Sequence, residues 1–216
     1  MRFRSLGLEI PITPLSLDIR NELHESAKRR KTMFNERRVA QMAAYLLGRG
    51  KERMNYLKLM KLSYLADRES MKRHAHPISG DRYVSMDHGP VLSQTFNLIK
   101  GAVQFSEQGW NHWIADRVDY DVSLKRKVHP EMLDELSEAD LAVLGDVHSK
   151  FGKMDQWKLV EYTHRYCREW ENPNGSSMPI SYENIFKALG RTSAEAKKLG
   201  ARVEQQRYID KLFADL

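Results

Sequence analysis

Residues 55–100 constrain the fold of this chain more than any other stretch. They begin with NYLKLMKLSYLAD, in which apolar side chains recur on almost every side of a helix. A helix with so little polar surface has to be packed on several sides inside a domain. Asn55 is well placed to be its N-cap. The sequence therefore predicts a central core helix over residues 56–71, around which the other elements assemble.

A loop, a strand and a second helix are predicted to follow the core helix. Pro77 and Gly80 mark the loop, because both residue types interrupt regular structure. Residues 83–86 are bounded by turn residues and form a short strand candidate. Pro90 suits the first position of a helix, where its missing amide hydrogen is not needed. We therefore expect the chain to turn at residues 87–89 into a helix that begins at Pro90.

Apolar residues at helical spacing predict further helices on both sides of this stretch. Ser137 with Asp140 has the spacing of a capping box, and Asp155 and Ser181 are suitable N-caps. The predicted helices cover residues 36–47, 137–151, 155–170, 181–189 and 193–213. In the last of these, the residues predicted to face inward are Leu199, Val203, Ile209 and Leu212.

A small sheet is predicted between the helices. Residues 118–124 alternate apolar with polar side chains, which is the period of a half-buried strand. Residues 110–114 are a candidate partner strand, and residues 83–86 a third strand of the same meander. The predicted class is α+β, a predominantly helical single domain with a small antiparallel sheet inserted between helices.

Composition limits the kind of protein this is. The chain has 216 residues, one cysteine and a net charge of +6. A lone Cys167 excludes an intramolecular disulfide and a multi-cysteine zinc site, and a reducing cytoplasm is expected. No apolar run approaches the roughly 20 residues that a bilayer-spanning helix needs. The positive charge allows an anionic partner, including nucleic acid, without requiring one.

The N-terminal residues 1–33 are expected to form an arm separate from a domain over residues 34–216. Within the arm, Ile19, Leu23 and Ala27 recur at helical spacing, so that it either packs on the domain or orders against a partner. A basic run follows, and it is either a solvated helix face or a patch that binds a partner. It consists of Lys28, Arg29, Arg30 and Lys31.

Candidate catalytic and metal-binding residues each have a simpler structural explanation. His74 and His76 could bind a metal with Asp81 or Asp87, but zinc usually takes at least three protein ligands, and a solvated loop pair is the favoured interpretation. Of the carboxylates ending the core helix, Asp67 is expected to accept hydrogen bonds from a nearby loop or strand.

Two further groups of residues also have a simpler structural explanation. His164 and Cys167 are neighbours on a helix and could form a nucleophilic pair, but a buried thiol is favoured. Four tryptophans with Tyr83 and Tyr120 could stack nucleic-acid bases, but large aromatic side chains more often fill a core. The residues therefore favour a binding protein over an enzyme, with no catalytic residue, no metal and no cofactor.

The motifs of residues 58–91 and 136–170 resemble the SocA-like antitoxin family, also described as GepA-like, whose shared domain is called Panacea. The first block carries a KLxKLxYxA helix, a Pro-Ile loop, an aromatic strand and a GPV turn. Its matching residues are Lys58, Lys61, Leu62, Tyr64, Ala66, Asp67, Pro77, Ile78, Tyr83, Gly89, Pro90 and Val91. The second block supplies Leu136, Ser137, Asp140, Phe151, Gly152, Leu159, Thr163, His164 and Trp170.

This resemblance covers residues 37–190 and implies the antitoxin of a bacterial or phage toxin–antitoxin pair, with a role in phage defence. It implies direct binding of a cognate toxin from an adjacent gene. The alternatives are an adaptor that delivers a partner to an AAA+ protease, and a DNA-binding regulator of its own operon. No catalytic residues come with the family, so its shared residues are expected to be structural. The predicted partner-binding residues are Lys28, Arg29, Arg30, Lys31, Asp87 and His88.

Overall fold

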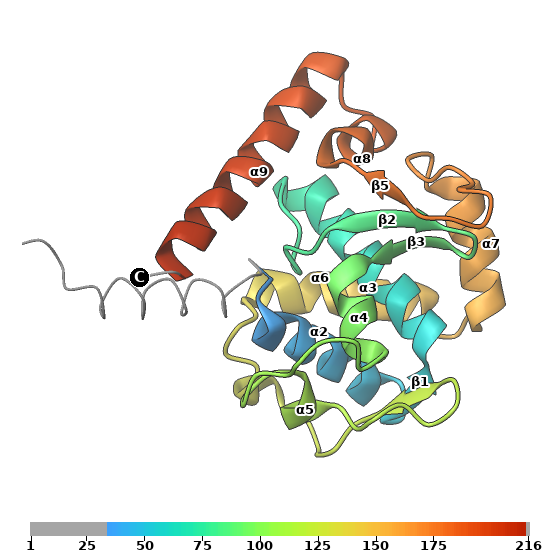
Figure 1. Cartoon of the computed structure of the whole chain (residues 1–216), viewed down its shortest axis with the longest axis vertical. Helices are drawn as coiled ribbons and strands as arrows, with labels where there is room; N and C mark the ends of the chain where they lie inside the picture. The colour runs from blue at the N-terminus through green and yellow to red at the C-terminus, as the bar shows by residue number, and fades with distance from the viewer. Residues whose placement is uncertain (1–33, 215–216) are drawn as a thin grey trace, which may run out of the picture.

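The computed structural model describes residues 34–214, and the predicted arm with its basic run Lys28–Lys31 lies outside the described residues. Figure 1 shows helices gathered around one central helix, with small sheets at its two ends. The helices are α2 (Glu36–Arg49), α3 (Tyr56–His74), α4 (Ser93–Ile99), α5 (Trp110–Trp113), the 3-10 turn η1 (Pro130–Met132), α6 (Glu138–Phe151), α7 (Gln156–Tyr166), α8 (Tyr182–Ala188) and α9 (Ser193–Ala214). The strands are β1 (Arg53–Asn55), β2 (Tyr83–Met86), β3 (Gly89–Leu92), β4 (Asp121–Ser123) and β5 (Met178–Ile180).

Helix α3 is the predicted core helix. The Asn55 side chain caps it by accepting a hydrogen bond from the Leu57 amide, as expected. The helix packs against α2, α6, α7 and β3, and twelve of its nineteen residues are buried. It continues to His74, one turn beyond the predicted end, and stops where Ala75 adopts the left-handed conformation. Burial on several sides confirms that α3 organises the domain.

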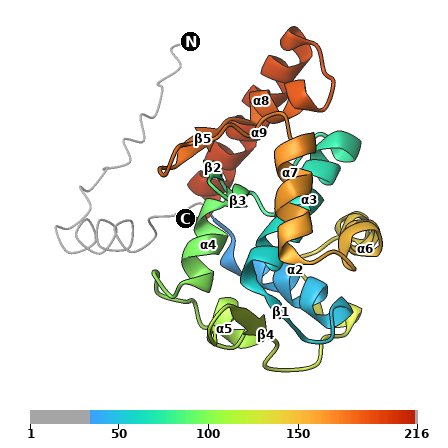
Figure 2. The same ribbon diagram turned by 90° about the vertical axis from the view of Figure 1, so that its right-hand side faces the viewer.

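The strands form two antiparallel sheets instead of the single predicted meander. One sheet has the order β3-β2-β5, and the other pairs β1 with β4. Figures 1 and 2 place the first sheet near α7 and α8 and the second at the far end of α3. The third strand of the first sheet is β5, whose Ile180 pairs with Tyr83. The fold class itself, mostly helical α+β, is confirmed.

Two elements differ from the prediction because tertiary contacts override local preference. Pro90 does not begin a helix. It lies in β3, opposite Ser85, and β3 is an edge strand, which tolerates a residue without an amide hydrogen. Helix α4 begins instead at Ser93, where the buried Asp81 carboxylate accepts hydrogen bonds from the Gln94 and Thr95 amides at 3.0 and 2.8 Å.

The predicted strand over residues 110–114 is mostly helix α5, in which Trp110 and Trp113 are buried. Only Ile114 keeps a bridge, to Leu124. In the predicted partner strand, Val118 and Tyr120 are exposed, so the alternation there does not mark a half-buried strand. The paired part of that stretch is the three-residue strand β4.

The structure confirms the helix N-caps that the sequence predicts. Ser137 and Asp140 form the capping box of α6, and Asp155 and Ser181 cap α7 and α8. Helix α7 ends at Tyr166, before the predicted limit at residue 170. In the part of the chain that the structure describes, no helix has the length and apolar character needed to cross a bilayer.

The last helix, α9, leaves the rest of the domain at an angle and packs chiefly against α8 (Figure 1). Val203 is buried, as predicted, but Leu212 is half exposed, so the prediction that it faces inward is wrong.

Candidate functional site

The hairpin formed by β2 and β3 is attached to α3 through the buried Lys61. Its Nζ donates a hydrogen bond to the Pro90 carbonyl oxygen at 2.8 Å, and the side chain is fully buried. Gly89 lies beside it with a φ of +94°, where a Cβ would come within 2.7 Å of Thr163 Oγ1 and 2.9 Å of Lys61 Nζ. Glycine is required here both for its backbone conformation and for the close approach of α3 and α7.

Burial lowers the pKa of Lys61 to about 7. Among the residues that the structure describes, no carboxylate pairs with the Lys61 ammonium, whose hydrogen bond goes to a neutral carbonyl. Desolvation of the charged form therefore dominates. The amine lies below the surface of the hairpin, so its role in this geometry is to fix Gly89 and Pro90.

A buried ion pair connects α3 to the segment that follows α7. The Glu169 carboxylate accepts hydrogen bonds from Tyr64 Oη at 2.5 Å and from Arg68 Nε at 2.7 Å. The Glu169 side chain is fully buried and that of Arg68 is 19% exposed. Because neither partner is well solvated, each depends on the other for neutralisation. Tyr64 and Arg68 lie one turn apart on α3, so this contact fixes the chain just before Trp170.

Trp170 supports the hairpin at its other strand, β2. Its Nε1 donates a hydrogen bond to the Met86 carbonyl at 2.9 Å, at the end of β2. The His164 ring stacks on the indole, with ring centroids 3.9 Å apart and an interplanar angle of 11°. Burial lowers the pKa of His164, and the nearby Lys61 acts in the same direction. The hairpin is thus held by the buried amine of α3 at β3 and by Trp170, on which His164 of α7 stacks, at β2.

Asp67 fixes the loop that leads into β2. Its carboxylate accepts hydrogen bonds from the amides of Ile78 and Ser79 at 2.9 and 2.8 Å, from the Ser79 hydroxyl, and from Tyr83 Oη at 2.8 Å. This confirms the expectation that Asp67 binds a nearby loop and strand. Burial raises the pKa of Asp67 to about 6, while the hydrogen bonds from Ser79 and Tyr83 oppose that shift.

The tip of the hairpin is exposed and lies beside α7. Asp87 Oδ1 accepts a hydrogen bond from the Gly175 amide at 2.9 Å. The His88 ring meets the Trp157 ring edge to face, with centroids 5.5 Å apart. Trp157 stands in the first turn of α7 and is 54% exposed. We call Asp87, His88 and Trp157 together the hairpin surface.

The other candidate residues are a buried thiol and a stacked histidine pair. Cys167 is buried, and burial together with the nearby Glu169 raises the pKa of its thiol to about 12. Within residues 34–214, as far as they are described, His, Cys, Asp and Glu form no group of three suited to a metal ion. His74 and His76 stack on each other, with centroids 6.0 Å apart, at the end of α3.

Comparison with family models identifies the protein family of this chain. Residues 59–171, just over half of the chain, match the model described as "Antitoxin SocA-like, Panacea domain". The chain belongs to the SocA-like antitoxin family. No curated protein and no solved structure matches it. The match begins in α3 and ends directly after Trp170, so it contains the Lys61 and Trp170 contacts of the hairpin, whereas Gly175 and β5 follow it.

The SocA-like motif residues are brought together around the hairpin, and most of them are buried in the domain. Buried members are Lys61, Tyr64, Asp67, Tyr83, Gly89, Pro90 and Thr163, and the partly buried members are His164 and Trp170. Of the predicted partner-binding residues, Asp87 and His88 lie exposed at the tip, whereas the basic run is outside the described residues.

Two residues of this site were missed from the sequence. Nothing in the local pattern around Glu169 signals an ion pair with Arg68, 101 residues away. The expectation that the tryptophans fill the core is wrong for Trp157, which is more than half exposed. Its position two residues after the N-cap Asp155, on the first turn of a surface helix, is the one signal that could have indicated exposure.

Lys61 makes the stability of this SocA-like domain pH-dependent. Its folded-state pKa of about 7 is below its usual 10.5, so between these values the unfolded chain holds a proton that the folded chain has released. Stability therefore rises with pH through this window. We expect the unfolding free energy of the wild type to rise, relative to that of Lys61→Met, by about 1 kcal/mol per pH unit from pH 7 to 8.5.

Urea denaturation at pH 7.0, 7.5, 8.0 and 8.5 measures this difference. Cys167 and the tyrosines are present in both proteins, so any pH slope that they add cancels in this difference. Lys72→Met, at an exposed position of the same helix, is the control and should leave the pH slope unchanged. Equal slopes for the wild type and Lys61→Met would contradict a neutral buried amine.

Proposed function

We propose that this member of the SocA-like family neutralises a cognate toxin by direct binding, without catalysing a reaction, and that the toxin contacts the hairpin surface. The family membership supports an antitoxin role in general. The observation that supports this surface is the exposed Trp157, held against His88 at the tip of the hairpin that the family motif builds.

The physical argument rests on how rigidly the hairpin surface is held. Lys61 bonds the Pro90 carbonyl of β3, Trp170 bonds the Met86 carbonyl of β2, and Asp87 is held by the Gly175 amide. A surface that is already ordered loses little conformational entropy on binding. Tryptophan is the residue type most enriched among side chains that dominate binding energy, because its large rigid ring buries much apolar area. The hairpin surface thus combines an aromatic anchor with two polar groups at its rim.

The rest of the site supports binding in preference to catalysis. The thiol of Cys167 is buried with a raised pKa, and the His164 ring stacks on Trp170. The amine of Lys61 is occupied by a backbone carbonyl. These groups support the fold of the hairpin, and the exposed side chains at its tip are suited to recognition.

Trp157→Ala is expected to weaken toxin binding by roughly 30-fold or more, because truncating an aromatic anchor typically costs at least 2 kcal/mol. Binding is measured by calorimetric titration of each variant with the toxin encoded by the adjacent gene. Relief of growth arrest is measured on co-expression of the two proteins. Tyr120→Ala is the matched control, since Tyr120 is 67% exposed and lies in the turn before β4, which belongs to the other sheet. The fold of both variants is checked by their unfolding midpoints.

The outcomes separate the function from the surface. Growth arrest that the wild-type chain does not relieve contradicts the antitoxin proposal. Relief by the wild type and equally by Trp157→Ala contradicts the hairpin surface alone. A toxin half-life that is the same with and without the chain supports neutralisation by binding over delivery to a protease.

A further inference from the structure

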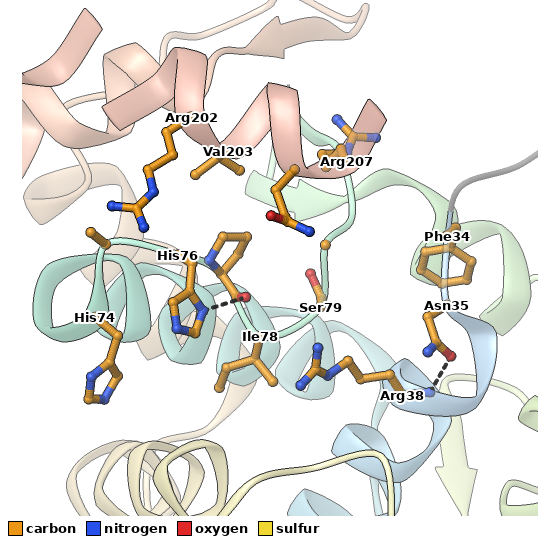
Figure 3. A pocket seen from close by; sticks show the side chains of 14 residues that line it. Phe34, Asn35, Arg38, His74, His76, Ile78, Ser79, Arg202, Val203 and Arg207 are labelled. Atoms are coloured by element: carbon orange, nitrogen blue, oxygen red, sulfur yellow. Dashed lines mark hydrogen bonds between the residues drawn. The ribbon is translucent and has the colours of Figure 1, made fainter. Parts of the chain in front are cut away.

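A groove of about 780 Å³ lies on a different part of the molecule from the hairpin surface. Figure 3 shows it between α9 on one side and the α3–β2 loop with the start of α2 on the other. The loop side is rigid, because Ile78 and Ser79 are held by the buried Asp67. The α9 and α2 sides come from residues outside the range that matches the family. Two of the three sides of this groove are therefore built by segments that the family match does not include.

The groove is strongly basic. No acidic side chain of the described residues lines it, whereas Arg38, Arg202 and Arg207 do, with His74 and His76 at one end. Figure 3 shows Arg202 reaching from α9 toward the loop and Arg38 lying along the opposite wall. So many positive groups with so few negative neighbours make the groove attractive to carboxylates.

The three arginines are neutralised to different degrees. Arg38 Nη2 is bonded to Asp140 at 3.1 Å, but its Nε is buried and has no hydrogen-bond partner among the described residues. Arg207 has a long contact of 3.5 Å to Glu204 and lies over the Tyr182 ring, and its buried Nε has no hydrogen-bond partner among the described residues. Arg202 makes no hydrogen bond or ion pair within the described part of the chain. Donors therefore remain available in the groove, with apolar side chains of Phe34, Pro77 and Val203 between them.

We infer that this groove binds residues 15–27 of the same chain. They read LSLDIRNELHESA, and their acidic residues Asp18, Glu22 and Glu25 are spaced i, i+4 and i+7. On the predicted helix these form one stripe, directly beside the apolar stripe of Ile19 and Leu23. An acidic stripe next to an apolar stripe complements a wall of arginines next to apolar side chains.

Chain connectivity favours this occupant over a separate molecule. Phe34 lines the groove, and six residues, 28–33, join it to the end of the segment. Six residues reach at most about 20 Å, which keeps the segment near the groove without dictating its direction. A short tether also raises the effective concentration of the segment to the millimolar range. A weak set of ion pairs then suffices for binding.

Hydrogen exchange of the full-length chain tests this inference. In the wild type, we expect the amides of residues 74–80 and 199–207, and those of residues 15–27, to be protected. The variant Asp18→Lys/Glu22→Lys/Glu25→Lys should exchange roughly fivefold faster in all three regions. Glu9→Lys, in the same arm outside the segment, is the matched control. Adding Arg202→Glu to the triple variant should restore part of the protection, whereas adding Lys198→Glu, on α9 outside the groove, should not.

Each other outcome overturns the inference. Equal exchange in the wild type and the triple variant shows that the groove is not occupied by residues 15–27. Protection that grows with protein concentration places the segment in the groove of a second copy. Protection that appears only after the toxin is added shows that the segment orders against the partner. The inference does not depend on the proposed toxin surface, so Trp157→Ala should leave the exchange of the groove unchanged.

Discussion

Glu169→Ala is expected to lower the free energy of unfolding by about 3–5 kcal/mol, because it leaves a buried guanidinium without its counter-charge. The Tyr64 hydroxyl loses its partner in the same change, since Glu169 Oε1 accepts from both Tyr64 and Arg68. Urea denaturation at pH 7 with linear extrapolation measures the loss. A loss this large would unfold a marginally stable domain. A second variant, in which Arg68 is also replaced, is therefore measured beside it.

The double variant Arg68→Ala/Glu169→Ala should be more stable than Glu169→Ala alone, because it removes the unpaired charge. Glu183→Ala is the matched control. It breaks an ion pair with Lys187 that is partly exposed on both sides, and the expected loss is about 0.5 kcal/mol or less. Equal losses for Glu169→Ala and Glu183→Ala would contradict the view that burial makes the Glu169 pair essential. Loss of the pair should also weaken toxin binding, since Glu169 fixes the chain before Trp170, which supports the hairpin.

Asp67→Ala is the second change with a large expected effect, about 3–5 kcal/mol. The carboxylate accepts from two amides and two hydroxyls, all of which are buried, and alanine leaves these donors without a partner. Asp67→Asn keeps one carbonyl acceptor but places an amide donor among donors, so about 1–3 kcal/mol is expected for it. Urea denaturation at pH 7 ranks the three proteins, and an alanine variant as stable as the wild type would contradict the role of Asp67 in fixing the loop.

The same carboxylate has a pH signature of the opposite sign to that of Lys61. Burial raises the pKa of Asp67 to about 6, from a usual 3.8. Between these values the folded chain holds a proton that the unfolded chain releases, so its contribution to stability falls as the pH rises from about 4 to 6. Asp67→Asn should remove this contribution. A stability difference between the wild type and Asp67→Asn that stays constant from pH 4 to 6 would contradict it.

Helices and their ends were predictable because their signals are local. The N-caps Asn55, Asp155 and Ser181 each bond an amide two or three residues away, so the interaction is visible in the sequence. Strand partners were not predictable in the same way. Both β1 and β5 have three residues, too few for an alternating pattern to stand out. The position of Pro90 in a strand depends on its pairing with Ser85 across the hairpin, which local helix preferences do not contain.

Two exposed residues of the candidate site could be predicted from the sequence, but the buried contacts of Lys61 and Glu169 that support it could not. Asp87 and His88 stand out because a turn before a Gly-Pro pair has to reach the surface. The roles of Lys61 and Glu169 depend on contacts across 29 and 105 residues of sequence, to Pro90 and Tyr64 respectively. A lysine in a helix is ordinarily assigned to the solvent. Its burial follows from the packing of α3 against both β3 and α7, which only the assembled fold reveals.

The burial of the one cysteine has a practical consequence. Cys167 is shielded and its thiol stays protonated at neutral pH, so maleimides and spin-label reagents should react with it very slowly. The natural sequence can therefore serve directly as a background for single introduced cysteines. A dye or nitroxide placed at an exposed position of α9 and a second one in the arm would give distances between them in the intact chain, with no need to replace a core residue first.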